Sequence, residues 1–198
     1  RDQGHPQFWG RITGTSSDAE SAEWLAANFR DIGLSDVRLQ PFDLVPQWMP
    51  QSWEVSVTSG GRSFVVESAQ PFYRAPGTSA DGLDLEAVYV GLGSEADFAG
   101  RDVRGKAVFT FSMLGVPSED ALRRAEAEGA AAVFDVLMLP GNMRYQAYPS
   151  GTDVPVFSVG SEDGYAVRDL IATAPAGRPP RVHITLDVDM TPGLETAL

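Results

Sequence analysis

The stretch from Val103 to Val136 constrains the fold of this chain most strongly, because it predicts a strand, a helix and a second strand in succession. The first strand is a β-branched and aromatic run, residues 108–111, that follows a Gly-Lys turn at residues 105–106. The second strand, residues 130–136, is apolar without alternation until Asp135, which is typical of a strand covered on both faces. We therefore expect a mixed α/β fold in which helices pack against a sheet.

The helix between these two strands has recognisable ends. Ser118 is a favourable N-cap, and Glu119 and Asp120 place negative charge in the first turn, where the helix dipole favours it. Gly129 supplies a left-handed stop. The side chains expected to face the sheet are small or apolar, namely Ala121, Leu122 and Ala125.

The composition is that of a globular protein and argues against several classes of partner and site. The 198 residues carry a formal charge of −12 and are 43% hydrophobic, which is enough for one domain, or for a small domain with an appendage. The 15 Lys and Arg residues are scattered, so we expect no nucleic-acid partner and no anionic-membrane surface. The sequence contains no run of about 20 apolar residues, so it predicts no membrane span. The absence of Cys excludes disulfides and thiolate metal sites.

The remaining segments predict further elements around this centre. Ser17 and Glu20 form a capping box that opens a helix ending near Gly33, and Pro41 interrupts an edge strand within residues 37–45. Residues 45–51 are expected to be a connection. Strands are expected at residues 53–58, 63–67, 84–90, 154–159 and 181–190, with a helix at 161–174.

One stretch imitates a cofactor site. Residues 91–96, GLGSEA, follow a predicted strand and match the dinucleotide fingerprint with Ala in the third place. Gly100, however, closes the helical window early, and the next strand ends at Phe111 and Ser112 without the acid that would bind a ribose. We therefore interpret the glycines as a turn.

Hydrolytic and metal chemistry is equally poorly supported. Ser158 has a glycine on only one side, whereas a nucleophile elbow needs glycines on both, so a buried strand serine is expected. The two histidines, His5 and His183, complete no Ser-His-acid set. His183 and Asp187 share a strand face but lie about 13 Å apart by strand rise, too far to bind one ion. We expect no catalytic and no metal-binding residue in this chain.

A long segment, residues 137–153, is the best candidate for a binding surface. It contains Met138, Met143, Tyr145 and Tyr148 together with turn residues. Loops of this length in compact domains are more often functional than idle.

Two groups of motifs resemble known families. VYVGLGSEADFAGRDVRGKAVFTF, AEAEGAAAVF and DVPVFSVGSEDGYAVRDLI resemble the protease-associated domain. GRITGTSSDAESAEWLAANFRDIGL resembles the opening segment of zinc aminopeptidases and carboxypeptidases of the glutamate carboxypeptidase and transferrin receptor type, peptidase family M28. In that group the protease-associated domain is inserted early in the peptidase domain, in the order found here.

The resemblance implies a domain organisation and a fold. Residues 1–52 would belong to a truncated peptidase domain, residues 53–190 to a protease-associated sheet or barrel flanked by helices, and residues 191–198 to a return linker. The zinc ligands of that family follow the inserted domain, so no ligand is transferred to a residue here. Zinc is expected in the missing catalytic domain, and this chain alone is expected to cleave nothing.

The resemblance also implies a role. The chain would act as a lid and specificity wall, with Met143, Arg144, Tyr145 and Tyr148 closest to a peptide substrate, or as a protein-interaction module. Its other partner would be its own peptidase domain, which Trp9, Trp24 and Phe29 would normally face, and the parent would be secreted or periplasmic. Two alternatives stay open: a free-standing secreted binding module, and the ectodomain of a noncatalytic protein similar to the transferrin receptor.

Overall fold

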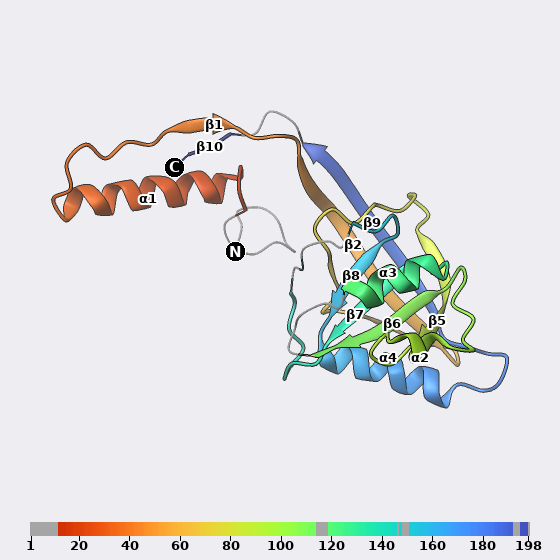
Figure 1. The fold of residues 1–198 in the computed structure, drawn as a ribbon. Coiled ribbons are helices and arrows are strands. Elements are labelled where there is room, and N and C mark those ends of the chain that lie inside the picture. Colours follow the sequence, from red (N-terminus) through yellow and green to blue (C-terminus); the bar gives the residue numbers. More distant parts are fainter. Residues whose placement is uncertain (1–11, 114–118, 146, 148–150, 192–194, 198) are drawn as a thin grey trace. The chain divides into compact units, whose positions relative to one another are not determined.

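The structure is a computed structural model that describes residues 12–113, 119–145, 147, 151–191 and 195–197 (Figure 1). The chain forms two compact units, one of residues 1–49 with 189–198 and the other of residues 50–188. We call these unit 1 and unit 2. The sequence predicted divisions after residues 52 and 190.

Unit 1 is a helix with a small antiparallel pair of strands. It contains α1 (Ser16–Asp31), β1 (Pro41–Asp43) and β10 (Glu195–Ala197), and Phe42 of β1 pairs with Thr196 of β10. The helix and the pair are joined by Asp18, whose carboxylate accepts hydrogen bonds from Gly14 N at 3.0 Å and Thr196 Oγ1 at 2.6 Å. The predicted capping box is wrong, because α1 begins at Ser16 with Thr15 as its N-cap.

Unit 2 contains most of an eight-stranded sheet. Its strands are β2 (Gln47–Ser59), β3 (Arg62–Val65), β4 (Gln70–Pro71), β5 (Leu83–Tyr89), β6 (Ala107–Ser112), β7 (Ala132–Leu137), β8 (Val156–Val159) and β9 (Arg181–Thr191). They lie in the order β3-β2-β9-β5-β6-β7-β8-β4. β5, β6, β7 and β8 are parallel, and β9 and β4 pair antiparallel on either side of them. Among the described residues of unit 2, three helices accompany the sheet: α2 (Glu95–Phe98), α3 (Glu119–Ala127) and α4 (Ser161–Thr173).

The centre of the sheet is buried on both faces, as its continuous apolar runs predicted. Every residue of β6, β7 and β8 is buried. On one face the rings of Phe109, Phe134 and Phe157 stack, with centroids 4.5 and 5.5 Å apart. α4 covers this face, because Tyr165 packs on Phe111 at 5.2 Å.

The opposite face of the parallel strands carries α3 (Figure 1). The predicted inner residues of α3, Ala121, Leu122 and Ala125, are all buried. Between α3 and β6 the backbone of Gly93 is so close that a methyl group there would lie 2.3 Å from Ala121 Cβ and 2.9 Å from Thr110 Oγ1. The helix therefore approaches the sheet closely because its inner side chains are small.

Two details differ from the sequence expectations. Residues 47–51, predicted to be a connection, belong to β2, in which Trp48 and Trp53 are buried. The two short strands β4 and β10 were not predicted. The mixed α/β class and the central strand, helix and strand are confirmed.

Candidate functional site

The candidate site lies at the carboxyl edge of the parallel strands. In open α/β sheets this is the edge at which ligands bind, because the strands end there together while the loops that follow them diverge. Met113 directly follows β6 and Met138 directly follows β7, and Met138 N donates a hydrogen bond to the Ser112 carbonyl at 3.1 Å. The two methionines therefore stand at neighbouring strand ends.

The residues after β7, which we call the edge segment (residues 138–145), are held to the first turn of α4. Ser161 Oγ donates to the carbonyls of Leu139 at 2.7 Å and Gly141 at 2.9 Å. In return, Asn142 Oδ1 accepts from Asp163 N at 3.2 Å. Because Gly160, the N-cap of α4, has no side chain, Asn142 supplies the acceptor that the helix end needs.

A second set of hydrogen bonds, made by Ser68, holds the same end of α4. Asp163 Oδ2 accepts from Ser68 N at 2.9 Å and from Ser68 Oγ at 2.6 Å, and Gly160 N donates to Ser68 Oγ at 2.9 Å. The start of α4 thus connects the edge segment to the chain before β4. The edge segment is consequently an ordered platform rather than a free loop.

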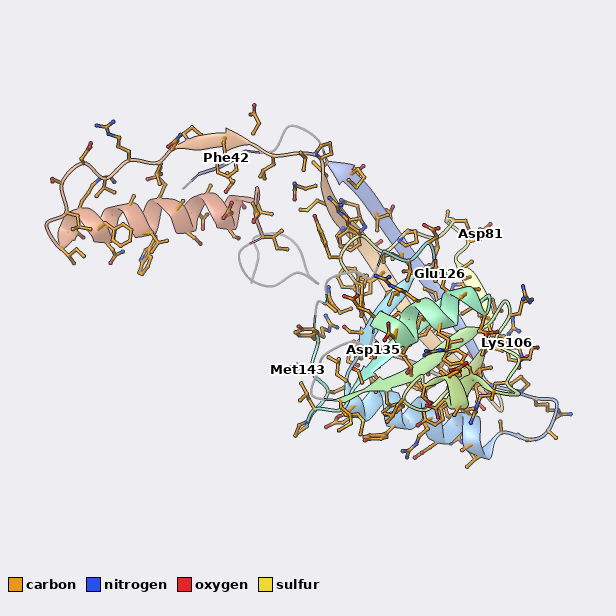
Figure 2. All side chains as sticks on the ribbon, viewed as in Figure 1. Phe42, Asp81, Lys106, Glu126, Asp135 and Met143 are labelled. Carbon is orange, nitrogen blue, oxygen red and sulfur yellow. The ribbon has the colours of Figure 1, made fainter. Side chains whose placement is uncertain are left out.

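The predicted binding residues of the edge segment differ in how they are placed. Met143 and Tyr145 are 41% and 40% exposed, and Figure 2 shows Met143 at the end toward which β6 runs. Arg144 is turned back on the unit, because its Nε donates to the Glu67 carbonyl at 2.7 Å and its Nη2 lies 3.7 Å from the Glu67 carboxylate. Tyr148 lies outside the described residues.

Two further apolar side chains lie at this edge: Met113, which was not singled out from the sequence, and Met138, which was named only as part of the segment 137–153. Met113 and Met138 are 62% and 41% exposed. Together with Met143 and Tyr145 they form what we call the methionine edge. The available signal was position, since each methionine directly follows a strand that the sequence predicted correctly. Methionine suits a surface that adapts to apolar side chains of differing shape, because it is unbranched and polarizable.

Beneath the methionine edge lies a buried acid that sequence analysis did not assign to a site. Asp135 is 1% exposed, and Ser112 Oγ donates to its Oδ2 at 2.9 Å. Its Oδ1 has no hydrogen-bond partner among the residues that the structure describes. Burial raises the pKa of Asp135 to about 7, while the hydrogen bond from Ser112 acts in the opposite direction.

The glycine stretch after β5 has the geometry of a turn. Gly91 and Gly93 both have positive φ, and α2, which follows them, is four residues long. The loop is occupied by the chain's own groups: a methyl group at Gly91 would lie 2.6 Å from the Asp97 carboxylate, and Arg124 Nη1 donates to the Gly93 carbonyl at 2.5 Å. The Asp97 carboxylate accepts hydrogen bonds from Ser94 N and Ser94 Oγ in a capping box. Because this negative charge already occupies the donors at the start of the helix, the turn is a poor site for a pyrophosphate.

The residues weighed for hydrolytic and metal chemistry have structural positions. Ser158 is fully buried and donates to the Tyr145 carbonyl, which confirms the prediction of a buried strand serine. His183 lies on the exposed face of β9, opposite Asp84 of β5. Within the described ranges, no group of three or more His, Asp or Glu side chains is arranged to hold a metal ion. These residues therefore do not fit a zinc centre.

Unit 1 carries a separate apolar groove, of about 510 Å³. It runs between α1 and the strand β1, and its apolar lining consists of Ala22, Leu25, Ala26, Phe29, Val37, Leu39 and Phe42. Phe29 and Phe42 are each 43% exposed, and Trp24 on the same helix is 64% exposed. Unit 1 therefore leaves aromatic side chains exposed to solvent, and an exposed apolar patch of this kind is typical of an interaction surface.

Among the described helices, none has both the length and the apolar character needed to cross a bilayer.

Comparison with known proteins finds similarity in structure alone. No model of a protein family matches this sequence, and no curated protein matches it. A zinc aminopeptidase from Bacillus subtilis, BSAP, aligns with a TM-score of 0.66 and 24% identity over 95% of this chain and 41% of its own. An aminopeptidase from Aneurinibacillus sp. strain AM-1 aligns with a TM-score of 0.61 and 22% identity, over 96% of this chain and 43% of the aminopeptidase chain. A peptidase M28 precursor from Shewanella amazonensis SB2B aligns with a TM-score of 0.68 and 15% identity, over 95% of this chain and 45% of the precursor chain.

The coverage of these alignments is asymmetric. Nearly all of this chain is matched, yet it spans less than half the length of each peptidase structure. At these levels of identity, the alignments establish the fold. The chain therefore has the fold of one part of these aminopeptidase structures.

Proposed function

We propose that this chain is the metal-free portion of a zinc-dependent exopeptidase of the M28 type and that it contributes a specificity wall to that enzyme. The observation that carries the proposal is the alignment of 95% or more of the chain with part of three aminopeptidases. The protease-associated character of residues 53–190, inferred from sequence motifs, belongs to the same proposal. Zinc and its ligands would reside in the part of the enzyme that this chain does not cover.

The apolar groove of unit 1 supports the first half of this proposal. Its aromatic and aliphatic lining, Phe29 and Phe42 among it, is what an interdomain contact with a larger partner would bury. We propose the remaining peptidase domain as that partner. Secretion of the parent is proposed on the family resemblance alone.

The methionine edge supports the second half. It combines an ordered backbone with side chains that stay 40% or more exposed, and a surface of this kind can contact a peptide without first paying to order its own backbone. We propose that Met143 and Tyr145 contact the substrate; the same role, expected of Tyr148 from the sequence, stays a prediction. Arg144 holds the edge segment in place through Glu67.

Steady-state kinetics of the complete parent enzyme tests this proposal. The double variant Met143→Ala, Tyr145→Ala should change the ratio of kcat/KM between an aromatic and a small aminoacyl substrate by about tenfold, because apolar contacts of this size discriminate by about 1–3 kcal/mol. The matched control is Val65→Ala, which truncates a similarly exposed apolar residue on β3 and should leave the ratio unchanged.

The possible failures of this test have distinct meanings. A parent without chelator-sensitive peptidase activity would refute the enzyme assignment and would favour the noncatalytic receptor. An active parent with an unchanged substrate ratio in the double variant would refute the specificity wall alone. A stop codon directly after Leu198 in the gene would favour the free-standing binding module.

A further inference from the structure

Four buried polar side chains form a row across the middle of the sheet, on the face that α3 covers. In register from β6 to β4 they are Thr110, Asp135, Ser158 and Gln70. Residues paired in register project to the same face of a sheet. Asp135 is the one titratable member of this row, and its Oδ1 finds no partner among the described residues.

Two covers exclude water from this row. Over Thr110 lie Gly93 and then α3, because a methyl group at Gly93 would lie 2.9 Å from Thr110 Oγ1 and 2.3 Å from Ala121 Cβ of α3. Over Ser158 lies the end of the edge segment, because Ser158 Oγ donates to the Tyr145 carbonyl. Asp135 lies on β7, which is paired between these two strands, so it lies between the two covers.

Among the residues that the structure describes, no neighbouring charge compensates the carboxylate of Asp135. β6 and β8 contribute no titratable side chain to this face. On α3 and the edge segment, the titratable groups are exposed or engaged elsewhere: Glu119 pairs with Arg123, Arg124 donates to Gly93, Glu126 accepts from Asp153, Arg144 binds Glu67, and Asp120, Glu128 and Tyr145 are exposed. A carboxylate buried with a single hydroxyl donor is costly, whereas the neutral acid is much less so.

We propose that Asp135 is a proton-operated latch for the edge segment: the neutral acid keeps residues 138–145 closed over the polar row, and ionisation of Asp135 opens them. Opening takes the edge segment rather than α3 because the two covers differ in burial. Ala121, Leu122 and Ala125 of α3 are at most 1% exposed, whereas Met138, Met143 and Tyr145 already face solvent. Admitting water along the edge segment therefore exposes less new apolar surface.

The direction of the pH dependence follows from linkage. The ordinary pKa of an aspartate is 3.8, and burial raises that of Asp135 to about 7 in the closed form. The closed form consequently binds more protons than the open form between these values. The equilibrium constant for closure is therefore highest in acid. It falls by up to about tenfold per pH unit as the pH rises from about 4 to about 7, and it is constant above that.

Amide hydrogen exchange of the whole 198-residue chain, corrected for the intrinsic exchange rate at each pH, tests the latch. Protection of residues 138–145 should fall by about tenfold per unit between about pH 4 and 7 and then level off, while protection of α3 stays constant. Asp135→Asn, which cannot ionise, should abolish the pH dependence. Asp187→Asn, which removes the same charge from the exposed face of β9, should retain the full profile.

A second variant keeps the test decisive if Asp135→Asn fails to fold. Ser112→Ala removes the hydrogen bond that lowers the pKa of Asp135, so the levelling-off should move to a higher pH. Three results would overturn the latch: an unchanged profile in Asp135→Asn, an equal loss of protection in α3, or a levelling-off in Ser112→Ala that stays where it is in the original protein.

Discussion

At the scale of single residues, the packing of α4 against β7 depends on a glycine. Gly164 is a buried residue of α4, and a methyl group there would lie 2.1 Å from Val136 Cγ1 and 2.7 Å from Cγ2. Both atoms belong to a fully buried side chain in the middle of the sheet. The helix can therefore lie this close only because position 164 has no side chain.

Gly164→Ala should lower the free energy of unfolding by about 2–3 kcal/mol, because the clash with Val136 outweighs the roughly 1 kcal/mol that alanine gains in a helix. Urea unfolding of the 198-residue chain measures the change. Val136→Ala removes both clashing methyl groups, so the double variant should be more stable than the sum of the two single changes predicts. Strict additivity would contradict the proposed contact.

Residue identity alone could not reveal the partner of Asp135. The sequence places an acid in an apolar strand, but the hydrogen bond from Ser112 depends on the register of β6 against β7, in which Ser112 pairs with Leu137 and Thr110 with Asp135. Register is set by packing over the whole sheet rather than by local sequence. The contact between Arg144 and Glu67 could not be predicted either, because these residues are far apart in the chain and meet only through tertiary packing.

At the scale of elements, strands with strong local patterns were predictable and short ones were not. β6, β7 and β9 have apolar or alternating runs bounded by turn residues, and their burial follows those runs. β4 consists of Gln70 and Pro71, and it exists because β8 offers a pairing edge. β10 likewise requires β1. Strands of two or three residues carry no periodic signal, so their formation depends on tertiary structure.

The start of α4 shows how one element depends on another. Its N-cap glycine lacks an acceptor, and Asn142 of the edge segment supplies one to Asp163 N. A cap that comes from a distant segment cannot be recognised from the helix sequence. The edge segment and α4 should therefore lose order together.

Asn142→Ala should destabilise unit 2 by about 1 kcal/mol, the usual cost of losing an N-cap acceptor. The first turn of α4 and the edge segment should both exchange amide hydrogens faster, since each is held by the other. Asn28→Ala is the matched control, because Asn28 is an exposed residue of α1 that donates to the Trp24 carbonyl. Faster exchange confined to α4 would show that the edge segment is held independently.

At the scale of the whole molecule, unit 1 exposes apolar surface that the proposed function assigns to a larger partner. Trp24, Phe29 and Ile32 of α1 and its C-terminal end are 64%, 43% and 74% exposed. Trp9, expected from the sequence to contribute to the same surface, lies outside the described residues. Isolated from a partner, such a surface favours association with a second copy.

The purified chain should consequently have a concentration-dependent solution mass above 21.3 kDa. Trp24→Glu with Phe29→Glu should restore the mass of a monomer, because two charges on the apolar face oppose its burial. Val65→Glu, which alters an exposed apolar residue of unit 2, should leave the association unchanged. Sedimentation of the three proteins measures this, and a monomeric original chain at high concentration would contradict the expectation.

In the proposed enzyme, this chain would supply fold, contact surface and specificity, and the metal chemistry would belong to another part. The motifs at residues 10–34 and 88–171 suggested this arrangement, and the alignments with less than half of each peptidase support it.

This division of labour can be tested by measuring hydrolysis of an aminoacyl-naphthylamide by the purified 198-residue chain in the presence of added Zn²⁺. We expect the chain to release naphthylamine no faster than a blank that contains the metal alone. Turnover by the chain alone that a chelator abolishes and added zinc restores would contradict it.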